Sequence, residues 1–497
     1  MNESLSLIRR SHDWPERIAI GDEEGTHTYD DLLSGSERGA ARLLGDTADL
    51  DQARVALMIE PSYRYVRAQW SIWRAGGVAV PLCLTHPAPE LEYVLDTTRP
   101  AVAVSSPRFD GILRPLAERR GIELLVDDEV DAGPVPLPTI DLARRAMILF
   151  TSGTTGRPKG VVTTHANIEA QITSLVEAWE WSTEDRILLT LPLHHIHGIV
   201  NVIGCALWSG ARCDMLPGFD AAEVSTRLAG GDLTLYMAVP TIYHRLIAML
   251  DQVSEEERAR VREGANRLRL MVSGSAALPI PVLERWRELS GHTLLERYGM
   301  TEIGMGLSNP YSGDRIPGSV GTPLPGVEVR LVDDQAEAVA DGEPGEIQVR
   351  GPAVFSEYWE RPEDTESAFT DDGWFRTGDT AVIESGRYRI LGRSSVDILK
   401  SGGEKISALE VEEVLLGHEA ISEAAVVGID DPEWGQRVVA VVVVEHPVDA
   451  EELRQWARGI LAPHKVPKEF HFTDALPRNP LGKTVKPEVV RMLAESR

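Results

Sequence analysis

Thr151-Ser152-Gly153-Thr154-Thr155-Gly156-Arg157-Pro158-Lys159-Gly160 is the stretch on which the interpretation of this sequence depends. Glycines let a backbone approach a ligand closely, and hydroxyls, cations and backbone N–H groups bind phosphate oxygens. The apolar run 146–150 before it has the length of a strand. Because Gly156 is followed by Arg157 and Pro158, this is not a Walker A loop. The stretch predicts a strand followed by a polyphosphate-binding loop, with a flexible surface turn as the alternative.

Composition indicates a soluble globular protein of more than one domain. The chain has 497 residues, of which 43% are hydrophobic and 26% charged. No apolar stretch reaches the roughly 18 residues of a membrane span, and the first residues lack the pattern of a secretory signal. The three cysteines, Cys83, Cys205 and Cys213, have no metal-ligand spacing. We therefore expect a reduced, cytoplasmic protein without a membrane partner.

The charge balance excludes one large class of partners. The formal net charge is -27, from 50 basic and 77 acidic residues. A nucleic-acid-binding protein needs a broad basic surface, so no nucleic-acid partner is expected. Any anionic substrate must be held by local cations, because the overall field repels it.

The order of predicted elements indicates an α/β protein. Residues 55–59 and 78–80 are typical of buried strands, and the helical pattern 63–75 lies between them. Further strands are expected at 187–191, 233–239 and 268–272. Such alternation predicts parallel sheets covered by helices. From about residue 318, alternating polar and apolar residues at 327–332 and 345–350 predict a small antiparallel barrel.

Three downstream segments complete a pattern with the opening loop. They are Tyr298-Gly299-Met300-Thr301-Glu302, Gly373-Trp374-Phe375-Arg376-Thr377-Gly378-Asp379 and Pro477-Arg478-Asn479-Pro480-Leu481-Gly482-Lys483. In this order, across most of the chain, they resemble the adenylate-forming superfamily of acyl-CoA synthetases, adenylation domains and luciferases. The resemblance implies a large N-terminal domain over 1–393, with its barrel-like part at about 318–393, and a small mobile α+β lid domain over 394–497.

The resemblance also implies ATP, Mg²⁺ and coenzyme A as reactants or cofactors. The phosphates would be held by the loop, and adenine would stack near the aromatic segment; the residues concerned are Thr151, Ser152, Gly153, Thr154, Thr155, Lys159, Tyr298, Gly299 and Met300. Thr301 would contact the α-phosphate and Glu302 would hold Mg²⁺, since a carboxylate beside a triphosphate needs a cation between them. Asp379 would accept hydrogen bonds from both ribose hydroxyls, and Arg393 would reach the ribose or a phosphate.

The C-terminal segments imply the chemistry of the lid. Lys483 would bridge the carboxylate oxygen and the α-phosphate, because attack of one anion on another needs a cation between them. Acetylation of Lys483 would remove that charge and is expected to abolish adenylation. The turn Ser401-Gly402-Gly403 would face the pantetheine thiol after the lid rotates. The family commonly has Asp or Lys two residues after the arginine, as the hinge, whereas this chain has Ser395.

Arg297 is the residue that indicates the acid. It precedes Tyr298, beside the expected carboxylate site, where relatives acting on fatty or aromatic acids generally have an uncharged residue. A buried arginine is costly unless an anion pairs with it, and a second carboxylate on the substrate would supply one. An ordinary ion pair with Glu296 or another neighbour is the alternative. Ser275 would donate a further hydrogen bond.

The run Leu191-Pro192-Leu193-His194-His195-Ile196-His197-Gly198 completes the acyl site. His195 matches the family position that gates the acyl pocket, and His197 is a further substrate-binding candidate. No cysteine or carboxylate at useful spacing completes a zinc ligand set. With Arg297 and Ser275, the run resembles malonyl-CoA synthetases, which also accept methylmalonate.

The sequence therefore predicts an ATP-dependent, AMP-forming malonate–CoA ligase. Because Arg297 lies so close to the reacting centre, only a spacer of about one carbon is expected between the two carboxylates. The alternatives are ligation of methylmalonate or another short acid, loading of the adenylate onto a carrier protein, and a catalytically dead nucleotide-binding relative.

Overall fold

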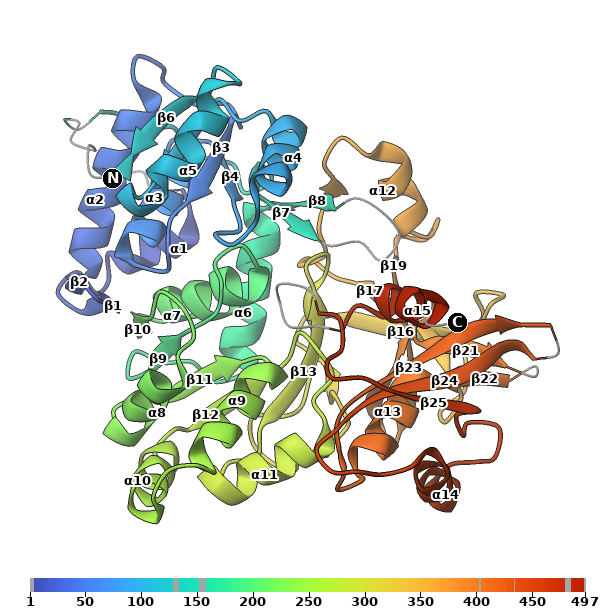
Figure 1. Ribbon diagram of the computed structural model, residues 1–497. Coiled ribbons are helices and arrows are strands. Elements are labelled where there is room, and N and C mark those ends of the chain that lie inside the picture. The colour runs from blue at the N-terminus through green and yellow to red at the C-terminus, as the bar shows by residue number, and fades with distance from the viewer. Residues whose placement is uncertain are drawn as a thin grey trace.

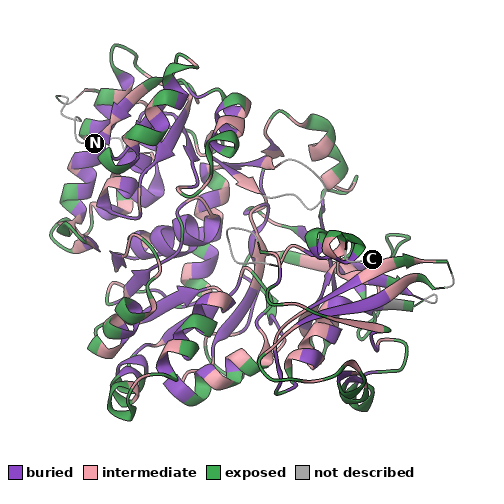
Figure 2. Cartoon of the chain, viewed as in Figure 1, coloured by how far each residue is buried: buried purple, intermediate pink, exposed green. Residues whose placement is uncertain are grey.

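The structure is a computed structural model that describes residues 4–127, 133, 135–151, 158–401, 404–432, 434–478 and 484–495. Figure 1 shows helix-covered sheets at the N-terminal side and a group of C-terminal elements to one side of them. Strands are largely buried, and the outer faces of the helices are exposed (Figure 2). No helix in the described parts is long and apolar enough to cross a membrane.

Two mixed sheets form the large N-terminal part. In the described residues the first sheet has nine strands in the order β15-β14-β13-β12-β11-β9-β10-β1-β2. They are β1 (Ile18–Asp22), β2 (Gly25–Thr28), β9 (Arg186–Leu189), β10 (Arg212–Met215), β11 (Leu235–Ala238), β12 (Leu270–Ser273), β13 (Leu295–Met300), β14 (Gly304–Ser308) and β15 (Thr322–Pro323). The strands from β1 to β13 along this path are parallel, and each edge carries antiparallel strands.

The second sheet has the order β18-β8-β7-β4-β3-β5-β6 in the described residues. Its strands are β3 (Arg54–Met58), β4 (Val78–Pro81), β5 (Val102–Ser105), β6 (Glu123–Val126), β7 (Arg145–Thr151), β8 (Lys159–Thr164) and β18 (Glu357–Tyr358). β3 and β4 have mostly buried residues, as expected for parallel strands covered on both faces.

The remaining strands form two smaller sheets. Where a small barrel was predicted, an antiparallel sheet of order β16-β17-β19-β20 follows the large sheets. The C-terminal sheet has the order β22-β21-β24-β23, with β25 parallel to β24. Their bounds are β16 (Glu328–Val332), β17 (Gly345–Arg350), β19 (Phe375–Glu384), β20 (Arg387–Arg393), β21 (Ile398–Ser401), β22 (Glu404–Ser407), β23 (Ile421–Asp431), β24 (Gly435–Val444) and β25 (Glu469–Phe472).

Helices connect the strands and cover the sheets. They are α1 (Ser6–Ser11), α2 (Tyr29–Leu44), α3 (Tyr63–Arg74), α4 (Ala88–Thr98), α5 (Pro107–Glu118), α6 (His165–Ala178), the π-helix η2 (His197–Gly204), α7 (Cys205–Trp208), α8 (Ala221–Gly230), α9 (Pro240–Leu250), α10 (Glu255–Ala265), α11 (Ile280–Ser290), α12 (Pro362–Ala368), α13 (Ala408–Leu416), α14 (Ala450–Ile460) and α15 (Lys486–Glu495). Local sequence sets several starts: the Thr164 hydroxyl accepts the Asn167 N–H in a capping box, and α6 begins there.

The predicted α/β class and its large and small parts are confirmed. The expected helix at 63–75 is α3, and the expected strand at 345–350 is β17. Several strand boundaries differ by one or more residues. Residues 293–296, before Tyr298, also predict a strand, but β13 begins at Leu295 and continues to Met300 because residues 297–300 pair with β14. Pairing with β14 thus continues the strand through Gly299, a residue that by itself would favour a strand end.

Candidate active site

Thr151 and Lys159, near the two ends of the stretch 151–160, belong to the paired strands of an antiparallel hairpin. Thr151 ends β7 and lies opposite Lys159, which begins β8. The predicted phosphate-binding residues Ser152, Gly153, Thr154 and Thr155 lie outside the described residues. The ammonium of Lys159 is 2.9 Å from Oδ1 of Asp364 and 4.9 Å from the centre of the Tyr358 ring. The hairpin therefore places a cation at the base of the loop.

Glu302 lies in the turn between β13 and β14, next to Thr301. Its side chain is buried, and Oε1 accepts a hydrogen bond of 3.0 Å from the Tyr358 hydroxyl. Burial raises the pKa of the Glu302 carboxyl, while Tyr358 and Arg393 oppose that rise. In the described residues no group of three or more His, Cys, Asp or Glu side chains could hold a metal by itself. A lone carboxylate still fits Mg²⁺, which commonly uses one or two carboxylates plus phosphate oxygens.

Asp379 and Arg393 face each other because their strands are paired. They are register partners in β19 and β20, and the Arg393 Nε donates to Oδ1 of Asp379 at 3.0 Å. The Tyr298 hydroxyl donates to the other carboxylate oxygen at 2.6 Å. Burial raises the pKa of Asp379, and the Arg393 charge opposes this. The structure thus brings together three residues predicted from three separate segments.

Gly299 and Met300 complete β13, where its register with β14 shifts. A Cβ on Gly299 would lie 2.1 Å from the backbone oxygen of Gly304, so only glycine fits this crossing. Met300 is half-buried and packs at the edge of the cluster around the four-stranded sheet. Both residues help to place Tyr298 toward Asp379.

Arg297 lies on the opposite face of β13 from Tyr298, because successive strand residues point to opposite faces. Its side chain is 3% exposed, and Nη2 donates to the Ser275 Oγ at 3.2 Å. Nε is buried without a hydrogen-bond partner, and within the described residues no carboxylate pairs with this guanidinium. Burial lowers the pKa of Arg297 to about 9. The alternative of an ion pair with Glu296 is wrong, since Glu296 instead accepts the Leu278 N–H at 3.2 Å.

The backbone around Ser275 is shaped to admit Arg297. A Cβ on Gly274 would lie 2.4 Å from the guanidinium carbon of Arg297, so a side chain here would displace it. Ser275 has φ of 68°, which a residue other than glycine adopts only at a cost of about 1 kcal/mol or more. Strained backbone that persists beside a buried cation indicates a functional site.

His197 extends this polar group. Its Nδ1 lies 3.4 Å from the Ser275 Oγ, which already accepts from Arg297. The Ser275 hydroxyl has one proton and two acceptor lone pairs, so it donates to His197 Nδ1 or accepts from it, depending on the tautomer of the ring. Burial and the nearby Arg297 lower the pKa of His197 well below its usual value, which keeps the ring neutral. His197 Nε2 is buried without a partner, so it is a second unused polar atom near Arg297 Nε.

The convergence of these side chains follows from the sheet. Ser275 follows the carboxyl end of β12, Arg297 follows the part of β13 that pairs in parallel with β12, and His197 begins the helix after the carboxyl end of β9. Ligands in parallel α/β sheets bind at this edge. His195 precedes η2, and its ring centre is 4.0 Å from that of His194, whose ring centre is 6.2 Å from that of His86.

The C-terminal candidates are described only in part. Ser401 is buried at the end of β21, while Gly402, Gly403 and Lys483 lie outside the described residues. Ser395 lies in the turn between β20 and β21, where the hinge was predicted. Sequence reasoning missed Tyr358, Asp364 and Lys486, because their contacts join segments far apart and no local motif marks them.

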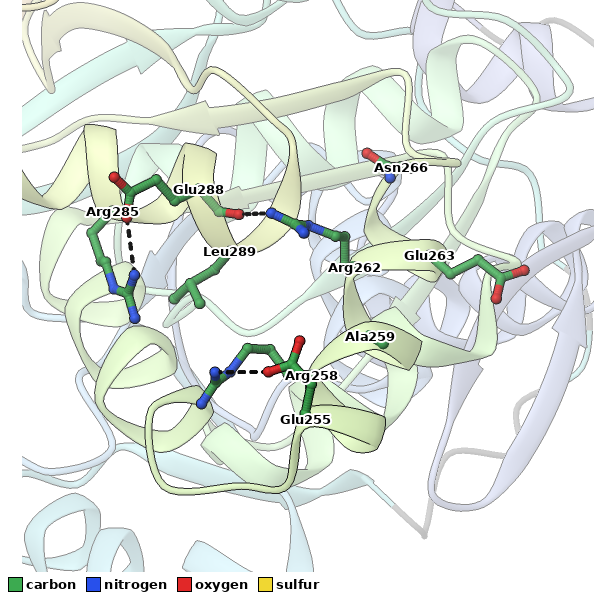
Figure 3. Close-up of a pocket in the computed structure, with 9 residues that line it drawn as sticks. All are labelled: Glu255, Arg258, Ala259, Arg262, Glu263, Asn266, Arg285, Glu288 and Leu289. Atoms are coloured by element: carbon green, nitrogen blue, oxygen red, sulfur yellow. Dashed lines mark hydrogen bonds and ion pairs between the residues drawn. The ribbon is translucent and has the colours of Figure 1, made fainter.

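A surface cleft of 430 Å³ lies between α10 and α11 (Figure 3). Its charges are already paired, for example Arg258 with Glu255 and Arg285 with Glu288. No predicted site residue lines it. The candidate site is therefore the edge of the sheet at β12 and β13, and not this cleft.

Comparison with known proteins agrees with this geometry. Residues 7–359 match the AMP-binding enzyme family, and residues 410–483 match the AMP-binding enzyme C-terminal domain. A mitochondrial malonate–CoA ligase from Bos taurus is 47% identical over 99% of this chain and 90% of the relative. The crystal structure of ATP-bound MatB from Rhodopseudomonas palustris is 33% identical, with a TM-score of 0.90 over 100% of this chain and 99% of that one. A malonyl-CoA ligase in a ternary product complex with methylmalonyl-CoA and AMP is 37% identical, with a TM-score of 0.70 over 93% and 97%.

Proposed function

The chain belongs to the AMP-binding enzyme family, and we propose that it ligates malonate to coenzyme A. A malonate oxygen attacks the α-phosphorus of ATP, which forms malonyl-AMP and releases pyrophosphate. The CoA thiol then displaces AMP to give malonyl-CoA. The similarity to malonate–CoA ligases over nearly the whole chain supports this assignment.

The single observation that carries the choice of acid is the unpaired arginine. Arg297 is buried with an unused Nε, and the neutral His197 has an unused Nε2 beside it. A carboxylate on the far end of the substrate would accept from Arg297 Nε, and from His197 in the tautomer with its proton on Nε2, and would neutralise the buried charge. A monocarboxylate such as acetate would leave them unsatisfied, which costs affinity in a dry pocket.

The nucleotide lies on the other face of β13 in this proposal. Asp379 accepts the ribose hydroxyls, Tyr298 stacks near adenine, and Arg393 pairs with Asp379 to hold the carboxylate in place. Lys159 and the loop from Thr151 bind the leaving phosphates, and Thr301 contacts the α-phosphate. Glu302 is the residue that would hold Mg²⁺, which when bound neutralises phosphate charge.

The lid assignments are part of the same proposal. We place the domain boundary at 393–394, because β20 ends at Arg393 and the C-terminal sheet begins at Ile398. Ser395 would be the pivot, Lys483 would bridge the reacting groups, and the turn from Ser401 would face the pantetheine thiol. Acetylation of Lys483 would remove its charge and stop adenylation.

Pyrophosphate release tests the assignment. Purified protein with MgATP and free CoA is assayed with acetate, malonate, methylmalonate and succinate, and product thioesters are identified by mass spectrometry. We expect malonate to give the highest kcat/KM and acetate and succinate to be poor. Succinate or acetate turning over as fast as malonate would overturn it, and adenylate formation without a CoA thioester would favour loading of a carrier protein.

Methylmalonate is the second candidate substrate. A 37%-identical malonyl-CoA ligase has been solved with methylmalonyl-CoA bound. The extra methyl group leaves the distance between the two carboxylates unchanged, so the same Arg297 contact is available.

The cytoplasm is the proposed compartment, supported by three buried free cysteines, although the bovine relative is named as mitochondrial.

A further inference from the structure

The segment that contains β18 is tied to both halves of the proposed phosphate site. Tyr358 pairs with Val161 of β8, the strand that begins with Lys159. The Trp359 N–H donates to the Gly160 oxygen at 2.7 Å. At the other end, the Phe355 N–H donates to the backbone oxygen of Glu302, also at 2.7 Å. Backbone hydrogen bonds therefore fix this segment to the lysine strand and to the carboxylate turn.

The Tyr358 side chain contacts both functional groups directly. It is 8% exposed, and its hydroxyl donates to Oε1 of Glu302 at 3.0 Å. The Lys159 ammonium is 4.9 Å from the centre of its ring, and Oδ1 of Asp364 holds the same ammonium at 2.9 Å. One rigid side chain thus lies between a cation at the start of β8 and a carboxylate in the turn between β13 and β14.

We propose that Tyr358 is a positioning residue for the phosphate end of ATP, holding Lys159 against its ring and Glu302 at its hydroxyl. The inference rests on the proposed function, because it takes Lys159 as a phosphate ligand and Glu302 as the residue for Mg²⁺. A cation is attracted to the face of an aromatic ring, which keeps the lysine near the loop. The Tyr358 hydroxyl holds Oε1 of Glu302 and leaves the second carboxylate oxygen for the metal.

The two contacts of Tyr358 can be removed separately. Tyr358→Phe deletes the hydroxyl and keeps the ring, whereas Tyr358→Leu deletes both. ATP binding is measured by titration calorimetry with Mg²⁺ and, separately, with EDTA. We expect Tyr358→Phe to weaken Mg²⁺-dependent binding about tenfold, the usual scale for a hydrogen bond to an ionised group, and to leave metal-free binding unchanged. Tyr358→Leu should weaken both.

Kinetics and a matched control complete the test. In the pyrophosphate assay, Tyr358→Phe should raise KM for ATP and the Mg²⁺ concentration for half activity, with KM for malonate unchanged. Tyr63→Phe also removes a tyrosine hydroxyl, one that donates to the backbone oxygen of Asp31 at 2.8 Å, and should change none of these values. Equal weakening with Mg²⁺ and with EDTA by Tyr358→Phe, or no weakening, would overturn the role of Tyr358.

Two further variants separate this inference from the proposed function. Lys159→Met should weaken ATP binding with and without Mg²⁺, and Glu302→Gln should weaken only the Mg²⁺-dependent part. If those two variants behave so while Tyr358→Phe has no effect, the inference fails and the phosphate-site assignments stand. If Lys159→Met and Glu302→Gln leave ATP binding unchanged, the phosphate-site assignments themselves are wrong.

Discussion

Replacing Arg297 by methionine is expected to damage catalysis and stabilise the fold at the same time. The guanidinium is buried, uses Nη2 on Ser275 and keeps Nε free for a ligand. A carboxylate bound there would gain two charge-assisted hydrogen bonds, each worth about 1.5–3 kcal/mol. Losing them should cost about 3–6 kcal/mol, which is a drop of about 150- to 20,000-fold in kcat/KM for malonate.

Stability should change in the opposite direction. Burial lowers the pKa of Arg297 to about 9, because the charge has no acidic partner in the folded chain. Replacing a buried ion by an apolar side chain of similar volume often stabilises a protein by about 1–4 kcal/mol. The variant should therefore unfold at a higher temperature than the wild type in the absence of malonate. Adding malonate should raise the unfolding temperature of the wild type but not of the variant.

The assay compares pyrophosphate release with malonate and acetate alongside thermal unfolding. Arg315→Met is the matched control, because Arg315 donates to the backbone oxygens of Thr293, Pro310 and Tyr311 and has no proposed contact with the substrate. That variant should lose stability and keep its preference for malonate. An Arg297→Met enzyme that still prefers malonate over acetate to the wild-type degree, or that is less stable than the wild type, would refute the reasoning.

Three other variants test the surrounding charges. Burial raises the pKa of Glu296 to about 8, so the folded chain keeps a proton that the unfolded chain loses from about pH 4.5. The free energy of unfolding should therefore fall as the pH rises from about 4.5 to about 8. Glu296→Gln should flatten that decline when thermal unfolding is measured between pH 5 and 9. Lys486→Met would leave the buried carboxylates of Asp397 and Glu412 without their cation and should cost about 3–5 kcal/mol in urea unfolding, against less than about 1 kcal/mol for the more exposed Lys465. Asp379→Asn should raise KM for ATP about tenfold and leave KM for malonate unchanged in the pyrophosphate assay.

Much of the site could be predicted because it is carried by short segments. Tyr298 and Asp379 lie in two motifs 81 residues apart, and the structure joins them by a hydrogen bond of 2.6 Å. The resemblance to the adenylate-forming superfamily predicted that both residues bind one nucleotide, and their proximity supports that prediction. Arg297 could be predicted for another reason. An arginine that is expected to be buried is costly, so it needs a partner of opposite charge.

The parts that sequence did not predict depend on long-range geometry. Tyr358 reaches Glu302 across 56 residues, and Lys486 reaches Asp397 across 89. A tyrosine in a stretch of mixed polar and aromatic residues and a lysine near a C-terminus are ordinary locally, so no pattern marks them. The extension of β13 to Met300 has the same cause, because its pairing with β14 is decided by packing.

Glu296 and Arg297 show how the fold holds two ionisable side chains in unfavourable surroundings. Neighbours of opposite charge would be expected to pair, but strand geometry sends their side chains to opposite faces of β13. Glu296 is left with one backbone donor and a pKa raised to about 8, and Arg297 with one hydroxyl and a pKa lowered to about 9. Both shifts oppose folding, and the φ of 68° at Ser275 adds strain at the same place. Glu296, Arg297 and Ser275 each depart from what the local sequence favours. Such departures at one place indicate a ligand site, because only a bound anion would offset the cost of burying the guanidinium.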